Sequence, residues 1–204
     1  MRKLILPLVA LLLFSFGNDT FKLSDEDRKM AIKHLSESKE QMAKVLKGLT
    51  AEQLNFQPGE DVWSIAQCVE HLAISENAFG GLIQKTVSAG PNPAMKDSVM
   101  LSDEQLLGII RPRDNRVQTR EPFKPSGKFG SYEATVEAFM NKRNQHISYL
   151  ESTEDDLRNR YSSDLPFGTV DGVQLILFMS GHTERHLSQI KEVMAHKLFP
   201  ANVD

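Results

Sequence analysis

Two histidines, His182 and His186, lie four residues apart in a stretch with the apolar spacing of a helix. Residues at this spacing lie on one helical face, about one turn from each other. Two neutral imidazoles so placed can bind one metal ion from one side. The residue after His182 is Thr183, so the glutamate of the zincin motif is missing. The pair therefore predicts half of a metal site and requires a further ligand.

His71 is the candidate for the third ligand. It lies midway along another predicted helix, with Cys68, Ser75 and Leu82 on its side of that helix, so we expect it to point inward. If the two helices are neighbours, three imidazoles and an open position could hold Zn²⁺, Ni²⁺, Fe²⁺ or Mn²⁺, and imidazole favours the first three. The open position would carry water or a substrate atom.

Side chains close to these histidines in sequence have alternative interpretations. Cys68 could add a thiolate that closes the site and makes it structural, but a buried apolar role is the simpler one. Glu70 and Glu184 could each orient the free ring nitrogen of a ligand, although adjacent residues on a helix point about 100° apart. Trp63 is expected to cover the start of its helix rather than bind a ligand.

The remaining histidines and a basic segment are weaker candidates. His34 is expected to be partly exposed, and His146 to lie in the core or on the surface, with a contact to the ligands as its alternative. His196 suits the end of its helix. Segment 111–116, with Arg111, Arg113 and Arg116, could hold an anionic substrate at a cavity mouth or form a solvated loop. No side chain is an obvious general base, so the catalytic residues stay unknown.

Four long amphipathic helices must position these residues. We expect them to begin after the capping residues Ser24, Ser64, Ser131 and Asp171, and to end near Gly48, Val87, Glu151 and His196. Single turns or short helices are expected after Thr50, Ser102 and Thr153, and no alternating run indicates a strand. The sequence thus predicts an all-α fold, a four-helix bundle with short helices in its crossing loops.

Composition and charge limit the class of protein. The chain has 204 residues, which is long enough for one domain with a real core. Hydrophobic residues make up 40% and charged residues 25%, as in a soluble globular protein. The net charge of −3 and the absence of a Lys/Arg block argue against a nucleic-acid partner. A single cysteine excludes an intrachain disulfide.

The N-terminus has the layout of a secretory signal peptide. Arg2 and Lys3 precede the apolar run 4–16, and small residues flank a cleavage site before Asn18. The run is shorter than the roughly 20 residues of a membrane span. We therefore expect residues 1–17 to be removed and residues 18–204 to form a secreted or periplasmic domain that does not bind membranes. Retention of the segment as an anchor is the alternative.

Two motifs resemble those of the DinB-like superfamily over essentially the whole mature chain. Residues 63–72, WSIAQCVEHL, resemble its WSxxxxxxHL signature, and residues 181–190, GHTERHLSQI, resemble its HxxxHxxQI signature. Segment 122–127 resembles its proline-rich crossing segment. The resemblance implies an up-up-down-down bundle in which His71, His182 and His186 bind a divalent metal.

The resemblance leaves the activity open. Similar bundles include metal-dependent thiol S-transferases, a thiol-dependent isomerase and proteins labelled as hydrolases. We therefore expect a bound divalent metal (Zn, Ni or Fe) and either a metal-dependent transferase or hydrolase acting on a small molecule, or a non-catalytic bundle with a structural metal. Low-molecular-weight thiols are scarce outside the cytoplasm, which counts against thiol transfer. A homodimer is one possible assembly.

Cleavage of the predicted signal peptide can be tested directly. If residues 1–17 are removed, mass spectrometry of the mature protein will show an N-terminus near Asn18. An intact Met1 in a cytosolic fraction would contradict this.

Overall fold

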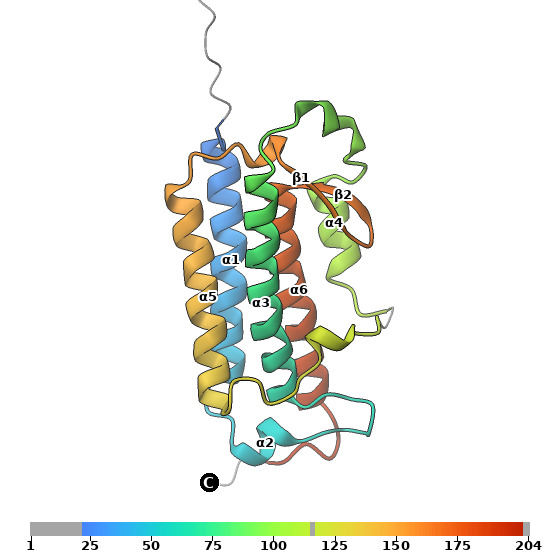
Figure 1. Ribbon diagram of the computed structural model, residues 1–204. Coiled ribbons are helices and arrows are strands. Elements are labelled where there is room, and N and C mark those ends of the chain that lie inside the picture. Colours follow the sequence, from blue (N-terminus) through green and yellow to red (C-terminus); the bar gives the residue numbers. More distant parts are fainter. Residues whose placement is uncertain (1–21, 115–116, 202–204) are drawn as a thin grey trace, which may run out of the picture.

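The computed structural model describes residues 22–114 and 117–201 (Figure 1). The expected signal peptide, residues 1–17, lies outside these ranges. Four long helices dominate the described chain: α1 (Asp25–Leu46), α3 (Ile65–Ser88), α5 (Tyr132–Ser152) and α6 (Gly172–Met194). No helix within the described ranges combines the length and the hydropathy that a membrane crossing requires.

Short elements fill the connections between the long helices. They are the helices α2 (Ala51–Asn55) and α4 (Asp103–Ile110), the 3-10 turns η1 (Pro93–Ser98), η2 (Glu121–Phe123) and η3 (Leu157–Asn159), and the strands β1 (Tyr161–Leu165) and β2 (Gly168–Asp171). The turns after Thr50 and Ser102 are confirmed. The turn expected directly after Thr153 is displaced to η3.

Side-chain caps begin the long helices where the sequence predicted. The Ser64 hydroxyl accepts a hydrogen bond from the Gln67 backbone N–H, and the Gln67 side chain accepts one from the Ser64 N–H. Asp171 and Gln174 form the same reciprocal pair at the start of α6. These bonds satisfy backbone donors that the first turn leaves unpaired. The caps therefore set where the histidine-bearing helices start.

A β-hairpin precedes α6, so the expectation that the chain has no strand was wrong. Tyr161 pairs with Asp171 and Ser162 pairs with Val170 in antiparallel register. The sequence does not predict these strands because they are short and mostly polar, and Val170 is their only buried apolar residue. Gly168, with a φ of 105°, makes the tight reversal that a side chain would strain.

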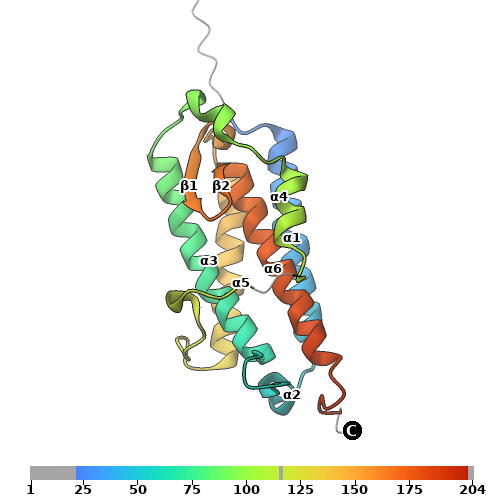
Figure 2. The same cartoon turned by 90° about the vertical axis from the view of Figure 1, so that its right-hand side faces the viewer.

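The four helices form a bundle in which α1 and α3 lie on opposite corners. Each of these two packs against both α5 and α6 (Figures 1 and 2). The expected bundle class is confirmed, but the helix directions differ from up-up-down-down. Figure 1 shows α1 antiparallel to α3, α3 parallel to α5, and α6 antiparallel to α5. Only the long connection 89–131 returns the chain to the opposite end of the bundle, because connections 47–64 and 153–171 each join two helices at the same end.

One buried ion pair joins all four helices in the core. The Arg143 guanidinium on α5 donates to both carboxylate oxygens of Glu76 on α3, at 2.5 and 3.0 Å. It also donates to Ser38 Oγ on α1 at 2.6 Å and to Thr183 Oγ1 on α6 at 2.8 Å. Arg143 and Glu76 are 0% and 1% exposed. A buried pair is tolerated when its hydrogen bonds are satisfied in this way.

Removal of one partner from this pair should be costly. We expect Glu76→Ala to lower the free energy of unfolding by about 3–5 kcal/mol, because the Arg143 charge would stay buried without its counter-ion. Urea unfolding of the metal-free protein measures the change. The matched control is Glu37→Ala, which breaks an exposed pair with Lys33 and should cost no more than about 1 kcal/mol. Equal losses in the two variants would contradict the role assigned to the buried pair.

Candidate metal centre

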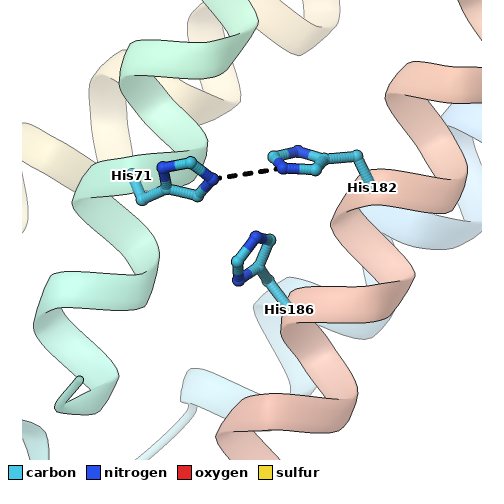
Figure 3. A group of neighbouring side chains, drawn as sticks. All are labelled: His71, His182 and His186. Carbon is cyan, nitrogen blue, oxygen red and sulfur yellow. Dashed lines mark hydrogen bonds between the residues drawn. The ribbon is translucent and has the colours of Figure 1, made fainter. Parts of the chain in front are cut away.

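Three imidazoles converge between α3 and α6, as Figure 3 shows. His71 comes from α3, and His182 and His186 come from successive turns of α6. One ring nitrogen of each lies within 4.8 Å of the others, and this is the only such group of three metal-binding side chains in the described ranges. The structure thus brings together the three residues that the sequence singled out.

The distance between two of the ring nitrogens matches that of two ligands on a single metal ion. A tetrahedral metal with bonds of about 2.0–2.1 Å to nitrogen holds its ligand nitrogens about 3.3 Å apart. The Nε2 atoms of His71 and His182 are 3.1 Å apart. Three protein ligands are also the number found in catalytic zinc sites, which keep the fourth position for water or substrate.

Burial keeps the three rings neutral. His71 and His186 are 5% and 7% exposed, and His182 is partly exposed. Burial lowers the pKa of His71, and it holds the pKa of His182 and His186 well below the ordinary value. The positive charge that each ring would carry when protonated adds to this effect. Neutral imidazoles keep the lone pair that a metal needs.

The outer ring nitrogens of two ligands have defined partners. His71 Nδ1 donates to the backbone carbonyl of Phe123 at 2.8 Å. His186 Nδ1 lies 2.9 Å from Oε1 of Gln189 and donates to it. A proton on Nδ1 leaves the lone pair on Nε2, which faces the centre. Nδ1 of His182 is buried and has no hydrogen-bond partner among the described residues.

Gln189 is the functional residue that the sequence reasoning missed. It lies three residues after His186 on α6, where side chains on one face meet. That spacing, together with the ability of an amide oxygen to accept from an imidazole, was the available signal. Among the described residues, Glu70 and Glu184 make their hydrogen bonds to groups other than the ligand rings, so neither orients a ligand.

Glu70 instead holds the crossing segment in place. Its carboxylate accepts from the backbone N–H groups of Ser126 at 3.0 Å and Lys128 at 2.7 Å. Burial alone would raise the pKa of Glu70, but these backbone bonds bring it below its ordinary value. His71 is the next residue on α3. It binds the same segment, through its hydrogen bond to the Phe123 carbonyl.

The basic segment is docked on α6. Arg111 pairs with Glu184 at 2.6 Å, and Arg113 pairs with Glu192 at 2.8 Å. Arg113 also donates to Gln189 Oε1 at 3.1 Å. Neither arginine is left in a solvated loop, and Arg116 lies outside the described residues.

Aromatic rings surround the ligands. Trp63 packs against His71 and His186, with ring centroids 5.1 and 6.2 Å apart, so it does more than cover the helix start. The ring centroids of Phe79 and Phe178 lie 5.6 and 6.0 Å from that of His182. Phe167, at the tip of the β-hairpin, packs against Phe178 at 5.3 Å. The hairpin therefore backs one wall of the centre.

The other candidates lie away from the ligands. Cys68 is fully buried in the apolar core and is not part of the histidine group. His146 is buried, and its Nε2 lies 3.2 Å from the backbone carbonyl of Glu76, so the core interpretation holds. His34 is partly exposed as expected. His196 lies just beyond the end of α6 and packs against Phe56 at 5.6 Å.

Comparison with known proteins gives the family. The model of the DinB superfamily matches residues 34–190, which include all three histidines. The uncharacterized protein YuaE of Bacillus subtilis (strain 168) is 26% identical over 148 residues, which are 72% of this chain and 87% of YuaE. The solved structure of YfiT from Bacillus subtilis, described as a probable metal-dependent hydrolase with an unusual four-helix bundle topology, is 15% identical and superposes with a TM-score of 0.50, covering 84% of this chain and 87% of YfiT. The chain belongs to the DinB superfamily.

Proposed function

We propose that this protein binds one divalent metal ion through His71, His182 and His186 and uses it to hydrolyse or transfer a group on a small molecule. The observation that carries the proposal is the convergence of three imidazoles from two helices, of which His71 and His186 are buried and His182 is partly exposed. The description of YfiT as a probable metal-dependent hydrolase supports the same class of chemistry. Zinc, nickel and iron all suit an all-imidazole site.

The residues of the chain have separate tasks in this proposal. A metal held there would act as a Lewis acid or lower the pKa of a bound water or thiol. Phe123 and Gln189 orient two of the ligand rings. Trp63, Phe79 and Phe178 exclude water from the sides of the centre. The nearby carboxylates Glu70 and Glu184 are engaged elsewhere, so a metal held by the three histidines would supply the activation of the nucleophile.

We further propose that the protein acts outside the cytoplasm, after removal of residues 1–17. Export favours hydrolysis over thiol transfer, because cytosolic thiols would be scarce there. The second candidate function is a non-catalytic bundle whose metal pins α3 to α6. The helix-joining position of the three ligands, at the boundary of α3 and α6, favours this alternative as well.

Replacement of one ligand tests the metal site. We expect His186→Ala to remove the metal from the purified protein, because two imidazoles leave half of the coordination sphere empty. Elemental analysis of the purified variant measures this. The control is His34→Ala, a partly exposed histidine outside the cluster, which should keep full occupancy. Full metal retention in His186→Ala would refute the assignment.

Turnover separates the two functions. The protein loaded with Zn²⁺, Ni²⁺ or Fe²⁺ should hydrolyse or transfer at least one member of a panel of ester, amide and thiol-transfer substrates, and His186→Ala should be inactive on the same member. A metal-loaded protein that stays inactive on the whole panel, and that is more stable than its metal-free form, supports the structural alternative.

The state of Cys68 tests whether a thiolate closes the site. Burial raises the pKa of Cys68 to about 12, so its thiol should stay protonated and unreactive toward a disulfide reagent at pH 8 until the protein is unfolded. Cys68→Ala should retain its metal, as judged by elemental analysis. Loss of the metal in this variant would show that the thiol is a ligand and that the site is closed.

A further inference from the structure

The ring partners of two ligands differ in a way that matters for metal binding. His71 Nδ1 faces a backbone carbonyl, which can only accept a hydrogen bond. His186 Nδ1 faces the side-chain amide of Gln189, which carries an acceptor on one side and a donor on the other. If that amide were turned over, its NH₂ would donate to Nδ1, and the proton of His186 would move to Nε2. A protonated Nε2 cannot bind a metal.

Arg113 determines which way this amide is turned. Its Nη1 donates to Gln189 Oε1 at 3.1 Å, the same oxygen that accepts from His186 Nδ1. A guanidinium has donors and no acceptor, so a turned amide would set its NH₂ against another donor. Arg113 is itself held in place, because its Nε donates to Glu192 Oε1 at 2.8 Å and its side chain is only 20% exposed.

We infer that Arg113 is a positioning residue that selects the Nδ1–H tautomer of His186 through Gln189, and so keeps His186 Nε2 free to bind metal. The inference rests on the proposed function, because the tautomer of His186 matters to the protein only if the site binds metal. The tautomer itself is a property of the metal-free protein and can be measured there. In this inference the basic segment acts on the metal centre through Gln189.

Arg111 provides a matched control. It lies in the same segment and is likewise paired with a carboxylate of α6, Glu184. Glu184 makes no hydrogen bond to a ligand ring, so loss of Arg111 should loosen the segment without affecting the tautomer. Methionine is the replacement in both variants, because its unbranched side chain replaces the aliphatic part of arginine and removes every donor.

Nitrogen-15 NMR of the metal-free protein at pH 8 tests the tautomer directly. Two-bond ¹H–¹⁵N correlation spectra show which nitrogen of each imidazole carries the proton. The wild type and Arg111→Met should show His186 protonated at Nδ1, whereas Arg113→Met should show a mixture or the Nε2–H form. His71, whose carbonyl partner cannot turn over, should stay Nδ1–H in all three. A folded Arg113→Met protein with His186 wholly in the Nδ1–H form would overturn the inference.

Zinc affinity gives the second measurement. Loss of a partner that orients a ligand commonly weakens metal binding about 10–100-fold, so Arg113→Met should bind Zn²⁺ at least several-fold more weakly than Arg111→Met. The double variant R113M/Q189A should bind no more weakly than Q189A alone, because Arg113 acts through Gln189. Losses that add in the double variant would contradict this.

A glutamate at position 189 should make Arg113 dispensable. A carboxylate presents an oxygen to His186 Nδ1 whichever way it is turned. R113M/Q189E should therefore bind Zn²⁺ within about threefold of Q189E, and a much larger loss would contradict the inference. If the wild type binds no metal at all, the proposed function fails, while the NMR spectra still decide the role of Arg113.

Discussion

The metal centre depends on the buried ion pair between Arg143 and Glu76. One guanidinium touches all four long helices, and it meets α6 at Thr183, the residue directly after the first ligand of that helix. Glu76 lies on α3, just over one turn beyond His71. A bidentate pair has a narrow range of acceptable geometry, so it fixes α3 relative to α5, and the hydrogen bond from the same guanidinium to Thr183 ties α6 to both. We therefore expect the histidines of α3 and α6 to meet only when this arrangement is kept.

The irregular segment between α3 and α5 serves the centre from outside the bundle. In its carboxyl-terminal part, two backbone N–H groups donate to Glu70, and the Phe123 carbonyl accepts a hydrogen bond from His71. In its amino-terminal part, Arg113 donates a hydrogen bond to Gln189 Oε1, which also accepts one from His186. A long connection is required in any case to bring the chain back along the bundle. Here the same length of chain also orients two of the three imidazoles.

The chemistry of the centre is set by what surrounds the ligands. Burial holds the pKa of His182 and His186 well below the ordinary value, so both rings stay neutral and able to bind metal. Trp63, Phe79 and Phe178 pack against the ligand rings. The two carboxylates next to ligands in sequence are engaged elsewhere, Glu70 with backbone N–H groups and Glu184 with Arg111. In the proposed reaction, a bound metal would therefore be the main means of activating the nucleophile.

The sequence by itself determined the features that depend on neighbours along the chain. Capping boxes and apolar spacing predicted where the long helices begin, and the spacing of four residues placed His182 and His186 on one face, because both signals act within a turn or two. Only the tertiary structure decided the helix directions, the short polar hairpin and the roles of Gln189 and Arg113. Those depend on contacts between segments far apart in sequence, and local spacing carries no information about which side chain a distant segment will present.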